Sequence, residues 1–114
     1  MRTIAHWVDG KYYEGNPIGR FAVENPGTGE VEAELLQASD ADLDHVVEVA
    51  RRAQKEWAKV SLAKRTAIMF RMRQLVLDHQ DEMAKMIVAE HGKNYSDAIG
   101  EIQRGRETLD FATA

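Results

Sequence analysis

The hydrophobic pattern of this sequence changes its period at Ser39, and that change limits the chain to a mixed fold. Before Ser39, short apolar runs alternate with clusters of Gly, Asn and Pro, which is typical of strands and turns. After Ser39, apolar residues recur every three or four positions, which is typical of amphipathic helices. The sequence therefore predicts an α+β chain, with two β-hairpins in residues 1–37 and about four α-helices in residues 38–114.

The first predicted hairpin pairs Ile4–Val8 with Lys11–Tyr13 across Asp9 and Gly10. An Asp-Gly pair suits a type I′ turn, because both central residues of that turn need positive φ. We expect two short antiparallel strands here.

The second predicted hairpin pairs Phe21–Glu24 with Glu30–Leu36 across the turn cluster Asn25–Gly29. A glycine-rich loop can also cradle a phosphate, but here no helix follows and no Lys-Ser/Thr pair closes the motif. The pattern therefore favours a plain turn. Along the second strand, apolar residues alternate with glutamates, which predicts one buried face. The apolar set is Val31, Ala33 and Leu35.

Three of the four predicted helices begin at a serine that suits an N-cap. Ser39 with Asp42 three residues later resembles a capping box, Ser61 starts the second helix, and Ser96 starts the fourth. The third helix ends at Gly92. The stripes expected to face a core are Leu43, Val46, Val47, Ala50, Ala53 and Trp57 in the first helix; Leu62, Met69, Met72, Leu75 and Val76 in the second; Met83, Met86 and Ile87 in the third; and Ala98, Ile102, Gly105, Leu109 and Ala112 in the fourth.

Composition excludes several classes of function. The formal net charge of −4 argues against nucleic-acid binding, which needs a basic surface. No apolar run approaches the roughly 20 residues that span a bilayer, and no signal-peptide core is present, so we expect a cytoplasmic protein without a membrane partner. The absence of cysteine removes thiolate nucleophiles and thiolate metal ligands, and the four histidines lack ligand spacing.

Arg104 is the one residue for which we predict a binding role. It lies about 120° around the helix from the predicted apolar stripe and one heptad before Phe111. Such an arginine either forms a solvent-exposed pair with the aromatic residue or lies on a helix face that another part of the protein covers. In the second case its planar guanidinium suits a carboxylate ligand.

Several stretches resemble the N-terminal region of aldehyde dehydrogenases, and together they extend over nearly the whole chain. They are His6–Lys11, Asn25–Glu30, Ser61–Thr66 and Glu90–Lys93. The Ser-Leu-Ala-Lys-Arg-Thr stretch and Gly100–Gly105 are specifically similar to methylmalonate-semialdehyde dehydrogenases. That family oxidises methylmalonate or malonate semialdehyde with NAD and transfers the acyl group to coenzyme A, in valine, β-alanine or inositol breakdown.

The resemblance implies that these residues are part of the α/β coenzyme-binding domain of a homo-oligomeric oxidoreductase. It also implies that Arg104 helps to hold the carboxylate of the small semialdehyde substrate. Arg106 departs from the family pattern, which has an apolar or neutral residue there. The family's catalytic cysteine, general-base glutamate and dinucleotide-binding strands come later in the chain. We therefore assign no catalytic, cofactor-binding or metal-binding residue, and expect no activity and no bound NAD or coenzyme A, for residues 1–114 alone.

The last predicted helix runs to Ala114 without a stop signal, so we interpret the sequence as the front part of a larger protein. Two alternatives stay open. One is a free-standing helical interaction module, and the other is a fragment of another family member such as a succinate-semialdehyde dehydrogenase. The second alternative would make Arg104 incidental.

Overall fold

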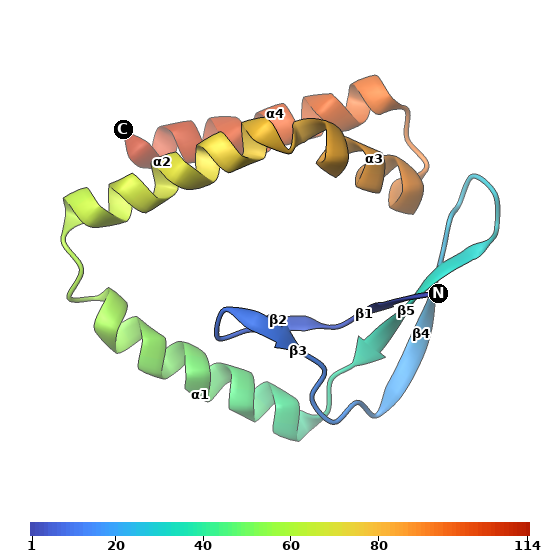
Figure 1. The fold of residues 1–114 in the computed structure, drawn as a ribbon, viewed down its shortest axis with the longest axis horizontal. Helices are drawn as coiled ribbons and strands as arrows, with labels where there is room; N and C mark the ends of the chain where they lie inside the picture. Colours follow the sequence, from blue (N-terminus) through green and yellow to red (C-terminus); the bar gives the residue numbers. More distant parts are fainter. The chain divides into compact units, whose positions relative to one another are not determined.

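The computed structural model describes all of residues 1–114 and separates them into two compact units. The first unit consists of residues 1–24 and 29–59, and the second of residues 25–28 and 60–114. Five strands precede four helices along the chain (Figure 1). The predicted α+β class is therefore confirmed. The predicted domain division, with a β-hairpin region in residues 1–37 and the helical part of an incomplete domain in residues 38–114, stays a prediction.

The first predicted hairpin is present in the first unit. Strands β2 (His6–Val8) and β3 (Lys11–Tyr13) pair antiparallel, with Trp7 opposite Tyr12. Asp9 and Gly10 have φ values of 55° and 72°. Both central residues of the turn therefore have the positive φ that a type I′ turn requires.

A separate three-stranded sheet has the order β1-β5-β4. Strand β4 (Gly19–Glu24) pairs antiparallel with β5 (Val31–Gln37), so the second predicted hairpin is also confirmed. Strand β1 (Arg2–Ile4) pairs parallel with β5 on the other side. The prediction of one continuous strand over Ile4–Val8 was wrong, because β1 finds its partner about 30 residues away, beyond the reach of a local pattern.

Burial along β5 departs from the predicted alternation. Ala33 is buried as expected, but Leu35 is 38% exposed while Leu36, on the opposite face, is only 2% exposed. Leu35 lies opposite Phe21 on β4, which is itself 54% exposed. The prediction that only one face of this strand is buried was wrong. Strand β5 is the central strand of its sheet, and Leu36 is covered on the other face.

Helix α1 (Asp40–Trp57) begins with the predicted capping box. Ser39 Oγ accepts a hydrogen bond from the Asp42 amide at 3.1 Å, and the Asp42 carboxylate accepts one from the Ser39 amide at 3.0 Å. The expected apolar stripe of α1 is largely open: Leu43, Val47 and Trp57 are exposed. Within residues 1–114, the packing of α1 therefore depends on its first turn more than on its stripe.

The Asp42 carboxylate also holds the loop that precedes β4. It accepts hydrogen bonds from Tyr13 Oη at 2.9 Å and from the Asn16 amide at 3.0 and 3.1 Å. The hydrogen bond from the Ser39 amide, followed by those from the Asn16 amide and the Tyr13 hydroxyl, keeps the pKa of Asp42 well below its ordinary value. Gly15 has φ of 66°, and a Cβ atom there would lie 2.4 Å from Asp42 Oδ1, so this close approach requires glycine.

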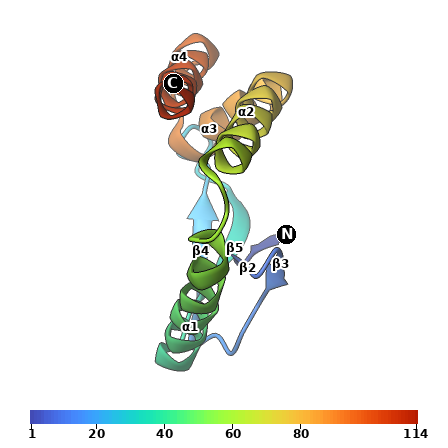
Figure 2. The same cartoon turned by 90° about the vertical axis from the view of Figure 1, so that its left-hand side faces the viewer.

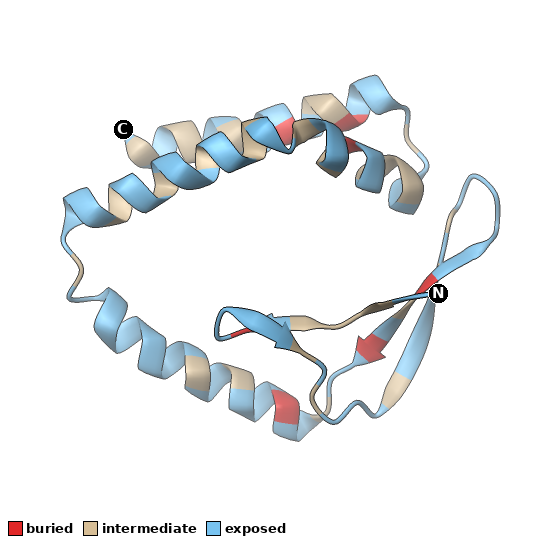
Figure 3. Ribbon diagram, viewed as in Figure 1, coloured by how far each residue is buried: buried red, intermediate tan, exposed pale blue.

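The second unit contains α2 (Leu62–Asp78), α3 (Gln80–His91) and α4 (Tyr95–Thr113). Figures 1 and 2 show α2 and α4 next to each other, with α3 leading from one to the other. Three buried residues, Ala84, Ala98 and Ile102, form the centre of its core. Figure 3 marks these buried positions on α3 and α4. Two alanines with no exposed surface let these helices approach closely.

The predicted apolar stripes of these helices are only partly buried. Val76, Met83 and Ile87 pack against the core as expected. Leu62 and Leu75 of α2 are exposed, at 79% and 56%, although the pattern placed them on a core face. That part of the prediction was wrong within residues 1–114, because no side chain of the described chain covers them.

The caps of the second unit agree with the sequence in two places and differ in one. Ser61 Oγ accepts from the Lys64 amide at 3.3 Å, and Gly92 ends α3 with φ of 82°. The N-cap of α4 is Asn94, whose side-chain oxygen accepts from the Asp97 amide at 3.0 Å. The prediction that Ser96 is the N-cap of α4 was wrong, because the chain reverses direction at Gly92 and α4 already begins at Tyr95. The Ser96 hydroxyl instead donates to the Asn94 side chain at 2.8 Å.

Candidate substrate-carboxylate site on the fourth helix

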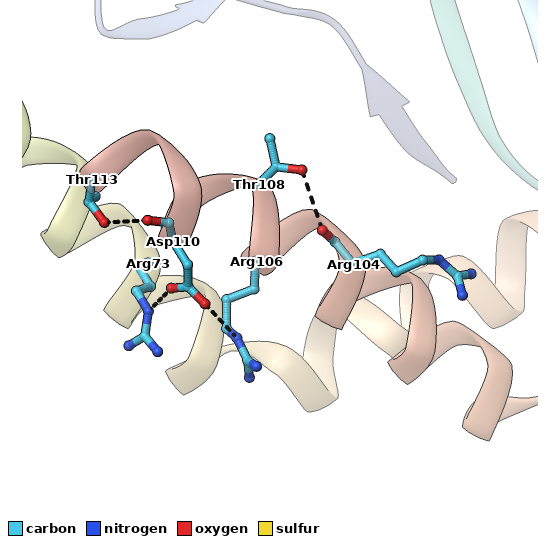
Figure 4. A network of polar contacts seen from close by, with 6 residues as sticks. All are labelled: Arg73, Arg104, Arg106, Thr108, Asp110 and Thr113. Atoms are coloured by element: carbon cyan, nitrogen blue, oxygen red, sulfur yellow. Dashed lines mark hydrogen bonds and ion pairs between the residues drawn. The ribbon is translucent and has the colours of Figure 1, made fainter.

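Arg104 lies in the middle of α4 on its exposed side. Its carbonyl oxygen accepts a hydrogen bond from Thr108 Oγ1 at 3.4 Å, and its guanidinium has no ion-pair partner in residues 1–114. Figure 4 shows the side chain reaching toward the beginning of α4. Phe111, one heptad on, is 87% exposed. An exposed, unpaired guanidinium can donate two parallel hydrogen bonds to a carboxylate ligand.

The beginning of α4 is fixed to α3 by polar contacts. Tyr95 Oη donates to Asp81 Oδ1 at 2.7 Å, and Lys85 Nζ contacts the other oxygen of Asp81 at 2.7 Å. The Lys85 ammonium, followed by the Tyr95 hydroxyl, lowers the pKa of Asp81. These contacts keep the first turn of α4 against α3, and thereby set the position from which Arg104 projects.

A second ion pair joins the turn before α4 to the helix itself. Lys93 Nζ lies 2.6 Å from Glu101 Oε1, with the Lys93 side chain 19% exposed and the Glu101 side chain 43% exposed. The hydrogen bond from Lys93 lowers the pKa of Glu101, and the charges of His91 and Arg104 act in the same direction. Glu101 is one helical turn before Arg104. The Glu101 carboxylate is therefore already paired with the Lys93 ammonium.

Arg106 faces a different direction from Arg104, although only one residue separates them. Asp110 forms an ion pair with Arg73 of α2 through one oxygen and lies 3.8 Å from Arg106 Nε through the other. Figure 4 shows Arg73 and Arg106 on either side of this carboxylate, with Arg104 pointing away from them. Arg106 thus shares the Asp110 carboxylate with Arg73, and the Arg73–Asp110 pair joins α2 to α4.

Arg106 also borders a largely apolar open cavity of about 410 Å³ between the helices of the second unit. Its Nε is buried and makes no hydrogen bond. The cavity is lined by Met72, Val76, Met83, Ile87, Glu101, Ile102, Gly105, Arg106, Thr108 and Leu109. Arg104 is not among these residues, so its side chain and this cavity are separate features of α4.

The glycine-rich cluster Asn25–Gly29 forms a turn between two antiparallel strands. The Thr28 amide donates to the Asn25 carbonyl at 3.2 Å, and the Gly27 amide donates to the Asn25 side chain at 2.9 Å. The prediction of a plain turn is confirmed. Because no helix follows it, this loop does not have the geometry that holds a nucleotide phosphate at a helix N-terminus.

Sequence reasoning singled out Arg104, whose binding role stays a prediction, and missed the ion pair between Lys93 and Glu101. The available signal was the chain reversal: Gly92 ends α3 and Asn94 caps α4, so the residue between them lies close to the next helix. The pair between Arg73 and Asp110 had no local signal, because 37 positions separate its members.

Comparison with known proteins decides the family. Residues 12–114 match the aldehyde dehydrogenase family. The chain belongs to that family. Malonate-semialdehyde dehydrogenase 2 of Oceanobacillus iheyensis is 40% identical over 113 residues, which are 99% of this chain and 23% of that protein. This aldehyde dehydrogenase chain therefore spans about a quarter of the length of such relatives.

Solved structures of aldehyde dehydrogenases have the same fold in this region. A Sinorhizobium meliloti 1021 protein assigned as a methylmalonate-semialdehyde dehydrogenase, crystallised with NAD, matches 97% of this chain and 23% of its own with a TM-score of 0.94 and 40% identity. Methylmalonate-semialdehyde dehydrogenase of Oceanimonas doudoroffii matches 100% of this chain and 23% of its own, with a TM-score of 0.95 and 35% identity. The resemblance inferred from the sequence motifs is therefore confirmed at the level of the family. No helix of the chain is long and apolar enough to cross a membrane.

Proposed function

We propose that residues 1–114 are the amino-terminal part of an NAD-dependent, coenzyme A-acylating dehydrogenase for methylmalonate or malonate semialdehyde. The observation that carries this proposal is 35–40% identity, over nearly the whole chain, to proteins named for these substrates. In the intact enzyme, Arg104 binds the carboxylate at the far end of the semialdehyde. Its exposed, unpaired guanidinium supports this role.

The role of Arg104 in this reaction is to bind and to orient. A semialdehyde of this class has a carboxylate at one end and the reacting aldehyde at the other. Two parallel hydrogen bonds from a guanidinium fix both the position and the direction of a carboxylate. Fixing that end restricts the aldehyde to one side of the site, which reduces the entropy lost on reaching the transition state.

NAD accepts the hydride in such a reaction and coenzyme A accepts the acyl group. Within residues 1–114 the one glycine-rich loop joins two strands of a hairpin, whereas a dinucleotide-binding loop joins a strand of a parallel sheet to a helix. We therefore assign the cofactor sites and the nucleophile to other parts of the intact enzyme. We also propose that the enzyme is cytoplasmic and homo-oligomeric. The exposed pair of Phe21 and Leu35 supports an interface on the sheet. A monomeric intact enzyme in sedimentation would contradict that last point.

The experiment that tests the proposal measures NADH formation by the intact enzyme with methylmalonate semialdehyde, with and without coenzyme A. We expect turnover to depend on coenzyme A and to yield an acyl-coenzyme A. Succinate semialdehyde in the same assay is the control substrate. Turnover without coenzyme A, or a preference for succinate semialdehyde, would contradict the proposal and favour another member of the family. An intact protein of only 114 residues at its source would favour an interaction module.

A further inference from the structure

Arg104 has two acidic neighbours on its own helix that could occupy it in place of a ligand. Glu101 precedes it by three positions and Glu107 follows it by three. Residues at this spacing have Cβ atoms about 5–6 Å apart, close enough for an ion pair. An arginine that binds a substrate carboxylate must be kept free of both competitors.

Geometry makes Glu101 the stronger of the two competitors. Side chains on a helix lean toward its N-terminus, over the preceding turn. Figure 4 shows the Arg104 side chain extended toward the beginning of α4, and in the sequence Glu101 precedes Arg104 whereas Glu107 follows it. Ion pairs on helices are also more favourable when the acidic residue precedes the basic one. The carboxylate that needs to be controlled is therefore that of Glu101.

The ion pair with Lys93 provides that control. Lys93 Nζ is 2.6 Å from Glu101 Oε1, and the Lys93 side chain is only 19% exposed, so this pair is screened less by solvent than an open surface pair. Gly92 places Lys93 there: it ends α3 in the left-handed conformation, and a Cβ atom at this position would lie 3.0 Å from Pro26. This turn brings Lys93, the residue after Gly92, next to α4.

We infer that Lys93 is a specificity-determining residue, which holds Glu101 so that Arg104 stays free for the substrate carboxylate. This inference rests on the proposed function of Arg104. Without the ammonium of Lys93, Glu101 would pair with Arg104 and would also repel an anionic substrate. Both effects weaken the binding of an aldehyde that has a carboxylate. Neither affects an aldehyde that lacks one.

The test compares the intact enzyme with its Lys93→Met variant on methylmalonate semialdehyde and on propanal. We expect the KM for methylmalonate semialdehyde to rise about 5- to 30-fold, the range between an exposed competing ion pair and a desolvated one. The kinetic constants for propanal should stay the same. Lys93→Arg keeps the charge and should keep the wild-type KM. An equal loss on both aldehydes would overturn the inference, because it would show that Lys93 only supports the fold.

Second-site variants identify the carboxylate responsible. Adding Glu101→Gln to Lys93→Met should restore the KM for methylmalonate semialdehyde to within about 2-fold, because the competing charge is gone. Adding Glu107→Gln instead is the matched control and should restore nothing. Rescue by Glu107→Gln, or by neither change, would overturn the inference.

Arg104→Leu separates failure of this inference from failure of the proposed function. If Arg104→Leu impairs only the carboxylated substrate while Lys93→Met changes nothing, the inference about Lys93 is wrong and the function of Arg104 stands. If Arg104→Leu does not distinguish the two aldehydes, the proposed function fails, and the inference fails with it.

Discussion

Replacing Arg104 by leucine in the intact protein should weaken the binding of a carboxylated substrate without weakening the fold. The guanidinium is exposed and has no partner among residues 1–114. A substitution at such a position usually changes the free energy of unfolding by no more than about 0.5 kcal/mol. The carbonyl that accepts from Thr108 belongs to the main chain and is kept in the variant.

The loss should therefore appear in the kinetics of the carboxylated substrate. Removing one partner of a largely desolvated charged pair costs about 2–5 kcal/mol, which corresponds to roughly 30- to several-thousand-fold in kcat/KM. We expect this loss for methylmalonate semialdehyde and almost none for propanal, which has no carboxylate. Arg104→Lys should recover only part of the loss, because an ammonium offers a point charge in place of a planar fork.

The assay is NADH formation with each aldehyde at saturating NAD and coenzyme A, together with a thermal unfolding curve for each variant. An equal loss for both aldehydes, or a lowered unfolding temperature, would mean that Arg104 is structural. No loss for either aldehyde would place it on an ordinary solvent-exposed surface. Either result would refute the reasoning from its unpaired guanidinium.

Two further predictions concern stability. Ile102→Ala should lower the free energy of unfolding by about 2–4 kcal/mol, because Ile102 is only 6% exposed in the core of the second unit. Chemical unfolding of the isolated chain tests this. The control is Leu62→Ala, at a position 79% exposed, which should change the free energy of unfolding by less than about 0.5 kcal/mol. Equal effects of the two substitutions would contradict the assigned core. Asp42→Asn should lower the free energy of unfolding at neutral pH and should make that free energy fall less in acid. The reason is that the pKa of Asp42 is depressed in the folded state, so its carboxylate stabilises the fold above its ordinary pKa. This stabilisation is lost as the pH falls below about 4. Unfolding curves between neutral pH and pH 2 test the sign, and an unchanged acid dependence in the variant, or one matching that of the exposed-site control Asp40→Asn, would contradict it.

Local residue chemistry determined the boundaries of most elements. Asp-Gly requires a turn with positive φ, Ser39 and Ser61 provide side-chain acceptors for helix N-termini, and Gly92 can end a helix in the left-handed conformation. Each of these effects acts over four residues or fewer. The sequence also placed Arg104 off the apolar stripe of its helix, because helical geometry alone fixes that relation.

Other features depend on contacts between residues far apart in the chain, and only the tertiary structure decided them. The parallel pairing of β1 with β5 and the ion pair between Arg73 and Asp110 join segments about 30 or more positions apart. Burial depends on the same packing: positions 35 and 36 are both leucine, yet only Leu36 is covered. The contact of Lys93 with Glu101, on which the specificity of Arg104 depends in our inference, exists because α3 and α4 pack together, and no pattern within a single helix contains that information.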